Sequence, residues 1–333
     1  MDRITIIGLG QIGSSMGLAI KRNLVAQKGP KVEIVGVDRE PETAARSRKV
    51  GAIDRIEYGI PVSVDGASLV IIATPVSAMP EVMELIGPAL KQGAIVIDVG
   101  STKGNVLKWA DELLPDHVNF VGGHPMAGSE IPGVAGSRAD LFDGRIFCVT
   151  PSTRAHADAV KTVIDIIYHL GAEPFFVDAE EHDGLVGGIS HLPIALSVSL
   201  MNLMRKEPAW RAMGRLAAGS FESMTRVSSG SPEMHKSIFT TNNQQMVRWI
   251  DAYIEELKNL RRSIAEGDDE ELLKNLKQAA RAHDRWLKKE YDTEDEPDLQ
   301  DIRAQMGNTV EQLLLPDRAI RAIRDLGKRN KKE

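Results

Sequence analysis

Three short segments carry side chains suited to acid–base or polar chemistry, and two of them follow apolar runs. Ser101 follows the run over residues 94–99, and His124 follows the run over residues 118–122. A histidine titrates near neutrality, so at the end of a strand it is well placed for general acid–base catalysis. Ser101 is equally suited to cap a following helix. His191, in Gly187-Gly-Ile-Ser-His191, either lines a cleft between two domains or is a hydrogen-bonded helix residue.

His124 stands between two glycines and a proline. We therefore predict that it lies outside any regular helix or central strand, in a loop at the carboxyl end of the preceding strand. Ligands of open parallel sheets lie beyond those ends. The next polar residues along the chain, Ser129 and Glu130, are expected at the same edge.

A glycine-rich turn opens the chain after the apolar run Ile4-Thr-Ile-Ile7. It contains Gly8, Gly10, Gln11, Ile12 and Gly13. In a dinucleotide-binding motif the first glycine allows a tight turn, the second lets a pyrophosphate approach, and the third lets the helix pack on the strand. The free N–H groups of the helix would then face the phosphates. The motif is weak alone, but here the strand and the helix are both in place.

The second apolar run ends in Asp38, where the motif expects an acid that binds the ribose hydroxyls and repels a 2′-phosphate. This favours NAD over NADP. The neighbouring Arg39 could attract that phosphate, but we interpret it as a solvated side chain. Thr74 and Pro75 end a further strand and provide a small, unreactive wall for a cofactor.

Strand-like and helix-like runs alternate up to about residue 180, and only helical patterns follow. This predicts a Rossmann-like doubly wound parallel sheet followed by an all-helical domain. We expect a dinucleotide-binding domain over 1–180, a helical substrate and dimerisation domain over 181–292, and a connector with a helical tail over 293–333. The expected strands are 3–8, 32–38, 68–74, 94–99, 118–122, 146–150 and 174–178.

Composition narrows the class of protein. The 333 residues are 42% hydrophobic and 26% charged, with a formal net charge of -6, which argues against a nucleic-acid partner. The single cysteine, Cys148, excludes a disulfide framework and fits a core position. No apolar run reaches the roughly 18 residues of a membrane span, and no leader peptide is expected, so we predict a cytoplasmic protein. We find no metal-ligand spacing and read the remaining histidines, His182 among them, as structural or exposed.

Five motifs together resemble the prephenate dehydrogenase family. The resemblance extends from Gly8 to about Leu260, and its most specific part is His-Pro-Met-Ala-Gly with a downstream Thr-Arg pair. The motifs are Gly8-Leu-Gly-Gln-Ile-Gly13, Asp98-Val-Gly-Ser-Thr-Lys103, Gly123-His-Pro-Met-Ala-Gly-Ser-Glu130, Ser190-His-Leu-Pro193 and Met224-Thr-Arg226.

The resemblance implies an NAD-dependent oxidoreductase of tyrosine, and hence aromatic amino acid, biosynthesis. It would convert prephenate to 4-hydroxyphenylpyruvate by oxidative decarboxylation, driven by aromatisation and without a metal. His124 would accept the ring hydroxyl proton, Ser101 would orient His124 or the hydroxyl, and Arg226 would hold a substrate carboxylate. Ser129 and Glu130 would lie at the substrate edge and His191 at the interdomain cleft. The resemblance also implies a homodimer.

Departures from the family pattern leave alternatives open. Ile194 replaces a second histidine, Ser223 replaces an acid, and His235 replaces an aromatic residue. The lost polar contact could indicate the aminated substrate arogenate. A β-hydroxyacid dehydrogenase is less favoured, because no lysine lies between Lys161 and Lys206. A non-catalytic NAD-sensing dimer is also less favoured, because a sensor needs none of Ser101, His124 and Arg226.

Overall fold

The structure is a computed structural model that describes residues 2–26, 32–129 and 131–291. The chain divides into two compact units, Met1–Glu255 and Glu256–Glu333. All of the candidate site residues belong to the first unit. The expected tail over 293–333 and Glu130 lie outside the described residues.

A single eight-stranded sheet forms the frame of the first unit, in the order β3-β2-β1-β4-β5-β6-β7-β8. All neighbouring pairs are parallel except β6 and β7, which are antiparallel. The predicted sheet is thus confirmed, with one reversed strand pair. The strands are β1 Asp2–Ile7, β2 Val32–Val37, β3 Arg55–Ile56, β4 Leu69–Ile72, β5 Ile95–Asp98, β6 Asn119–Pro125, β7 Ile146–Pro151 and β8 Glu173–Phe176.

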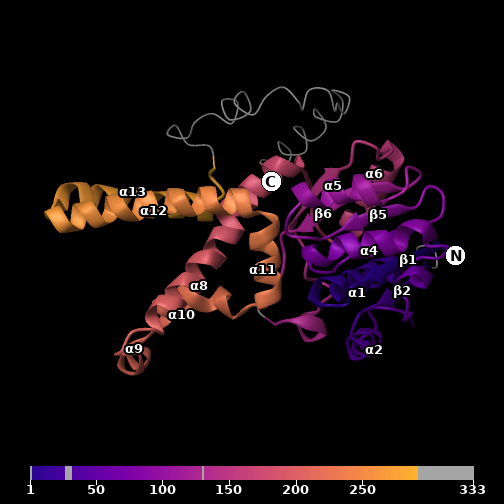
Figure 1. Cartoon of the computed structure of the whole chain (residues 1–333), viewed down its shortest axis with the longest axis horizontal. Helices are drawn as coiled ribbons and strands as arrows, with labels where there is room; N and C mark the ends of the chain where they lie inside the picture. Colours follow the sequence, from indigo (N-terminus) through magenta and orange to yellow (C-terminus); the bar gives the residue numbers. More distant parts are fainter. Residues whose placement is uncertain (1, 27–31, 130, 292–333) are drawn as a thin grey trace. The chain divides into compact units, whose positions relative to one another are not determined.

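Helices cover both faces of this sheet, because the strands are apolar on both sides. One core packs Ile6 and Ile71 of the strands against α1 and α6, and includes Met16 and Val163. The other core packs Val70 and its neighbours against α3, α4 and α5. Figure 1 shows these helices around the sheet. Their bounds are α1 Gln11–Ala26, α2 Pro41–Lys49, α3 Ile60–Ser63, α4 Met79–Ile86, α5 Gly104–Leu113 and α6 Ala157–His169.

Only helices follow β8 in the described chain. The long run from Ala179 contains a turn of π-helix, η4 (Gly187–His191), where Gly187 and Gly188 pack against Trp249 so closely that a Cβ would lie 3.0 and 2.8 Å from its ring. Helix α11 lies between α8 and the sheet (Figure 1). The bounds are α7 Ala179–Val186, α8 Leu192–Met204, α9 Trp210–Leu216, α10 Gly219–Thr225, η5 Arg226–Ser229, α11 Pro232–Thr241, α12 Asn243–Glu266 and α13 Asp269–Leu287.

His124 lies inside a strand, contrary to the loop position predicted. Strand β6 runs past the end of β5 and pairs there only with β7, with His124 opposite Cys148. The strand needs glycine just before His124, because a Cβ at Gly123 would lie only 2.7 Å from the carbonyl oxygen of Asp98. The histidine still lies at the carboxyl end of β6, so the prediction that it stands at this edge of the sheet is confirmed.

The helical run Ala179–Met204 corrects a second expectation, because its length and mean hydropathy of 1.5 are sufficient to cross a membrane. Glycine, serine and histidine residues interrupt the apolar residues of this run, so no uninterrupted apolar stretch is long enough, but the mean hydropathy over the run is still high. Core helices of folded proteins reach the same values. Here His182, Asp183 and His191 are buried and hydrogen-bonded to other parts of the first unit, which places the run within its fold.

Candidate active site

The glycine turn has the shape that a dinucleotide requires. Gly8 has φ +91°, and a Cβ there would lie 2.6 Å from the carbonyl oxygen of Ala73. A Cβ at Gly13 would lie 2.0 Å from the carbonyl oxygen of Gly8, whereas one at Gly10 would meet no atom within 4 Å. Gly8 and Gly13 are therefore needed for packing, while Gly10 faces open space. Ile12 packs on the core beneath the turn.

Asp38 closes the turn from the end of β2. Its carboxylate accepts hydrogen bonds from the N–H groups of Leu9 (2.7 Å) and Glu40 (2.9 Å). The carboxylate is thus fixed beside the glycine turn, where the ribose of a dinucleotide would lie. The side chain of Arg39 is 93% exposed and lies 3.4 Å from the carboxylate of the neighbouring Glu40, in agreement with its interpretation as solvated.

The end of β4 contains an unused hydroxyl. Thr74 Oγ1 is buried and has no hydrogen-bond partner among the described residues, and Pro75 beside it is exposed. A buried polar atom without a partner costs free energy unless a ligand satisfies it. Together with the open Gly10 and the first N–H groups of α1, this hydroxyl fits a bound nicotinamide dinucleotide.

Gln11 connects the turn to the loop that follows β6. Its Oε1 accepts the N–H of Ser129 at 2.9 Å, and its Nε2 donates to the carbonyl oxygen of Ile131 at 2.8 Å and to the Ser129 hydroxyl. Ser129 is exposed. The structure therefore places Ser129 against the predicted cofactor turn.

His124 is buried, at 8% exposure, and its Nδ1 lies 2.9 Å from Nε2 of His182. Burial is the main cause that holds the pKa of His124 well below its ordinary value, and His182, Lys103 and His191 lower it further. The imidazole is therefore neutral at physiological pH, which is the form that a general base requires.

His182 is a buried neighbour of His124 that the sequence pattern did not single out. Its side chain is 1% exposed. The sequence predicted a surface setting for His182, and that prediction was wrong. Its Nδ1 lies 2.9 Å from Oδ1 of Asp183. Asp183 in turn accepts the N–H groups of Lys103 (2.7 Å) and Gly104 (2.8 Å), where α5 begins. The adjacent His-Asp pair, close to the Gly187 to His191 segment, was the available signal.

A buried ion pair supports the backbone around His124. Lys103 Nζ bonds Asp98 Oδ2 and donates to the carbonyl oxygen of Gly123 at 2.7 Å, and both charged side chains are 0% exposed. Burial raises the pKa of Asp98, which Lys103 and the N–H groups of Gly100 and Gly123 oppose. The pair thus joins the ends of β5 and β6.

His191 lies in the same buried region. Its Nδ1 accepts from Asn242 Nδ2 at 3.1 Å, and the same amide donates to the carbonyl oxygen of Asp183 at 2.8 Å. Burial lowers the pKa of His191 to about 4, an effect that Asp183 partly opposes. Its Nε2 is near the carbonyl of Ser101 but makes no hydrogen bond of normal geometry. The Nε2–H of this neutral imidazole thus has no hydrogen bond of normal geometry among the described residues, although the Ser101 backbone interacts with His191 and raises its pKa slightly. The hydroxyl of Ser101 makes no side-chain hydrogen bond within the described residues.

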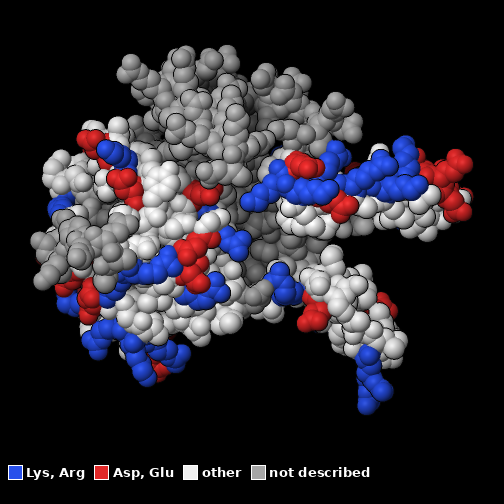
Figure 2. Space-filling view, turned by 180° about the vertical axis from the view of Figure 1, so that it is seen from behind, with Lys and Arg blue, Asp and Glu red and all other residues white. Residues whose placement is uncertain are grey.

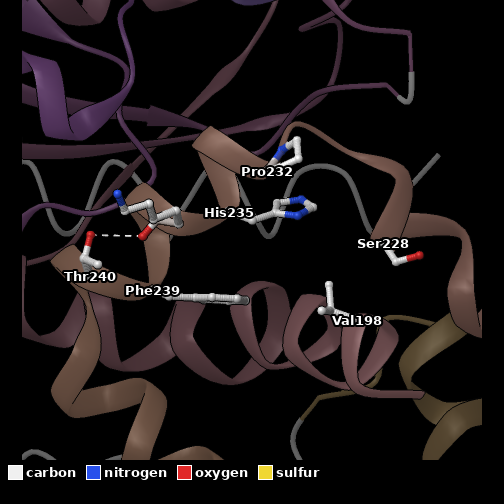
Figure 3. A pocket seen from close by; sticks show the side chains of 7 residues that line it. Val198, Ser228, Pro232, His235, Phe239 and Thr240 are labelled. Carbon is white, nitrogen blue, oxygen red and sulfur yellow. Dashed lines mark hydrogen bonds between the residues drawn. The ribbon is translucent and has the colours of Figure 1, made fainter. Parts of the chain in front are cut away.

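Arg226 begins η5 in the helical part and is exposed. The convergence of Arg226 and His124 on one substrate stays a prediction. A cavity of about 420 Å³ lies between α8, η5 and α11, and one of its lining residues, Ser228, belongs to the same short helix η5 as Arg226 (Figure 3). His235 and Phe239 line it, and burial lowers the pKa of His235. Ile194, the departure on α8, is 9% exposed; Ser223 on α10 is exposed.

The sequence predicts neither a disulfide nor a metal site. Cys148 is buried and its pKa is raised to about 11, mainly by burial, which supports a core role. In residues 2–26, 32–129 and 131–291 we find no group of three or more His, Cys, Asp or Glu side chains that could hold a metal ion.

The fold and the glycine turn together define a class: a dehydrogenase with a dinucleotide-binding sheet followed by a helical part. Comparison with known proteins gives the family. Residues 18–175 match the nucleotide-binding domain of prephenate dehydrogenase, and residues 178–278 match its dimerisation domain. The chain belongs to the prephenate dehydrogenase family, as the motif resemblance indicated.

Individual relatives agree. The prephenate dehydrogenase of Bacillus subtilis is 35% identical over 280 residues, which cover 84% of this chain and 74% of that protein. The cyclohexadienyl dehydrogenase of Zymomonas mobilis is 32% identical over 281 residues, covering 84% and 94%. The crystal structure of A. aeolicus prephenate dehydrogenase with hydroxyphenyl propionate and NAD+ has a TM-score of 0.78 at 27% identity, covering 85% of this chain and 97% of that one.

Proposed function

We propose that this chain catalyses the NAD-dependent oxidative decarboxylation of prephenate to 4-hydroxyphenylpyruvate in tyrosine biosynthesis. The observation that carries the proposal is a buried, neutral histidine, His124, at the carboxyl end of β6, on a sheet whose first turn is built for a dinucleotide. Family membership supplies the reaction class.

The cofactor would be held by the glycine turn and the end of β4. Gly8, Gly10 and Gly13 shape the turn, and Gln11 and Ile12 fix it to the protein around it. Asp38 would accept the ribose hydroxyls, and Thr74 and Pro75 would contact the nicotinamide end, with Arg39 at the rim. Bound NAD supplies the hydride acceptor.

His124 would take the proton from the ring hydroxyl of the substrate. Deprotonation pushes electron density toward the ring carbon that loses hydride, while the ring carboxylate departs as carbon dioxide and the ring becomes aromatic. This chemistry needs no metal. A neutral imidazole is suited to the step because it can accept the proton as the barrier is crossed.

The remaining polar residues would bind the substrate. The Nε2–H of His191, which makes no hydrogen bond of normal geometry among the described residues, can donate to a substrate oxygen. Ser101 would orient His124 or the hydroxyl, and Arg226 would bind a carboxylate through its paired donors. Ser129, placed by Gln11, and Glu130 would lie at the substrate edge.

We also propose the assembly and location of the protein. Residues 1–180 would bind the cofactor, residues 181–292 would bind substrate and a second copy of the chain, and residues 293–333 would form a connector and tail. The surface formed by α8, α9 and α10 is largely uncharged apart from a few acidic and basic side chains (Figure 2), and it exposes Leu203, Leu216 and Met224 by 56%, 83% and 53%. Such exposed apolar side chains fit a homodimer interface. The enzyme would act in the cytoplasm.

Arogenate is the second candidate substrate, and one observation favours it. Ile194 is buried at the position where the family carries a second histidine, so a polar contact to the substrate side chain is replaced by an apolar one. The test is NADH absorbance with NAD and each substrate in turn. Higher kcat/KM with prephenate supports the proposal, higher kcat/KM with arogenate supports the second candidate, and no NADH with either would refute both in favour of a sensor.

A further inference from the structure

Three side chains form a buried chain of hydrogen bonds that leads away from His124. The ring of His182 meets the ring of His124 edge-on, with 5.1 Å between centroids, and joins it through the 2.9 Å contact from Nδ1 to Nε2. The other nitrogen of His182 contacts the Asp183 carboxylate at 2.9 Å. All three residues are at most 8% exposed.

The donors in this chain can be assigned. Two backbone N–H groups, of Lys103 and Gly104, point at the Asp183 carboxylate from the first turn of α5. Both N–H groups need an acceptor, and an ionised carboxylate only accepts hydrogen bonds. His182 Nδ1 must therefore carry a proton. In a neutral His182 the Nε2 atom is then an acceptor, so the proton of the contact belongs to His124 Nδ1. This leaves the lone pair of His124 on Nε2.

We propose that His182 and Asp183 are positioning residues that fix His124 in its Nδ1–H form and receive charge from it during the reaction. When His124 Nε2 takes the proton of the substrate hydroxyl, its Nδ1 proton can move to His182 Nε2. The positive charge then rests beside the Asp183 carboxylate. One proton enters the chain at His124 and one is held at His182, and no other reactant is needed. The identity of the hydroxyl rests on the proposed function; the tautomer of His124 does not.

The surrounding charges favour this direction. Lys103 faces His124 from α5, but its ammonium is paired with Asp98 and the Gly123 carbonyl. His191 faces the group from η4, and its pKa of about 4 keeps it neutral. Asp183 is therefore the anion in direct contact with the histidine pair, and the proton is drawn to the His182 end.

Two variants separate positioning from packing. His182→Gln keeps a carbonyl oxygen that can accept from His124 Nδ1–H but cannot be protonated, and His182→Leu removes the acceptor at similar volume. His117→Gln is the matched control, because the His117 ring lies outside the candidate site and contacts the Leu90 carbonyl at 3.2 Å. The full-length protein is assayed with NAD and prephenate, and with arogenate if prephenate is not turned over.

We expect kcat to fall about 10-fold in His182→Gln and about 100-fold or more in His182→Leu, with KM for NAD within twofold of wild type. The acid limb of kcat should move to lower pH in His182→Gln, because a weaker acceptor makes His124 a weaker base. Unchanged kcat in both variants, or lower kcat with an unmoved acid limb, would overturn the proposal.

A second readout needs no turnover. Imidazole ¹⁵N spectra of the wild-type protein should show His124 and His182 both as Nδ1–H tautomers, and His182→Gln should keep that form for His124. An Nε2–H tautomer of His124 in the wild type would refute the inference even if the enzyme is active. If neither substrate is turned over, the proposed function fails while this spectrum still decides the tautomer.

Discussion

The side-chain amide of Gln11 receives the backbone N–H of Ser129 at 2.9 Å, across 118 residues of sequence. The same amide donates to the carbonyl oxygens of Ile131 (2.8 Å) and Gly136 (3.3 Å). The cofactor turn and the loop after β6 are therefore held as one piece by a single side chain. Binding of a ligand at the turn should therefore affect ligand binding at the loop, and the reverse.

Replacing Gln11 with alanine should raise KM for NAD and for the substrate together, each by about 10-fold. The change removes several hydrogen bonds, each worth roughly 1 kcal/mol net, and leaves their partners in the loop unsatisfied. Steady-state kinetics with either ligand varied measures this. The control is Gln244→Ala, at an exposed position at the start of α12. A rise confined to one ligand would show that the turn and the loop act separately.

Asp38 should set the preference for NAD over NADP. Asp38→Ser removes the negative charge beside the ribose, so repulsion of a 2′-phosphate is lost and the ratio of kcat/KM for the two cofactors should narrow by at least about 10-fold. Both cofactors should also bind more weakly, because the carboxylate holds the Leu9 N–H. Arg39→Ala serves as the neighbouring control. An unchanged ratio in Asp38→Ser would remove Asp38 from the ribose site.

The Lys103–Asp98 pair should make a large contribution to folding stability. Lys103→Met leaves the Asp98 carboxyl buried without its cation, and loss of one partner of such a pair costs about 3–5 kcal/mol. Urea unfolding at neutral pH gives the free energy of unfolding. Lys108→Met, at an exposed position on α5, the helix that Lys103 directly precedes, is the matched control. A loss below about 1 kcal/mol for Lys103→Met would mean that the pair contributes little.

His191 should make the folded state sensitive to mild acid. Burial lowers its pKa from 6.5 to about 4, so between these values the unfolded chain binds a proton that the folded protein does not. Its contribution is therefore present above pH 6.5 and is lost as the pH falls toward 4, by roughly 3 kcal/mol at most.

Urea unfolding of His191→Gln and wild type across this pH window checks the effect. The variant should lose less stability than wild type on acidification, because glutamine does not bind a proton in this pH range while its carbonyl oxygen can still accept from Asn242. His283→Gln, on α13, is the control. Parallel pH curves for His191→Gln and wild type would contradict the assignment.

The sheet could be predicted from the sequence because its strands are uninterrupted apolar runs, and the glycine turn because its spacing is fixed by the packing of Gly8 and Gly13. Short elements were missed. Strand β3 has two residues, and α11 starts at a proline in a polar stretch. The reversed β7 could not be foreseen, since strand direction depends on tertiary pairing rather than on local pattern.

The candidate site was predicted in part. His124 was found because the end of a strand is a position for ligands, but its place inside β6 depends on the partner strand β7. The adjacent His182-Asp183 pair is the one local signal in the sequence, but a neighbouring acid alone does not tell a buried helix histidine from an exposed one. The role of His182 appears only when residues 58 positions apart come into contact. Arg226 came from family resemblance alone, and its contact with substrate is still to be tested.

The most direct test of the central claim is the rate of NADH formation from NAD and prephenate by wild-type protein and His124→Ala, with NAD affinity measured separately on both. If His124 accepts the hydroxyl proton, the variant should lose about 10²–10⁴-fold in kcat while its Kd for NAD stays within about twofold. Turnover by His124→Ala close to that of wild type would contradict the account.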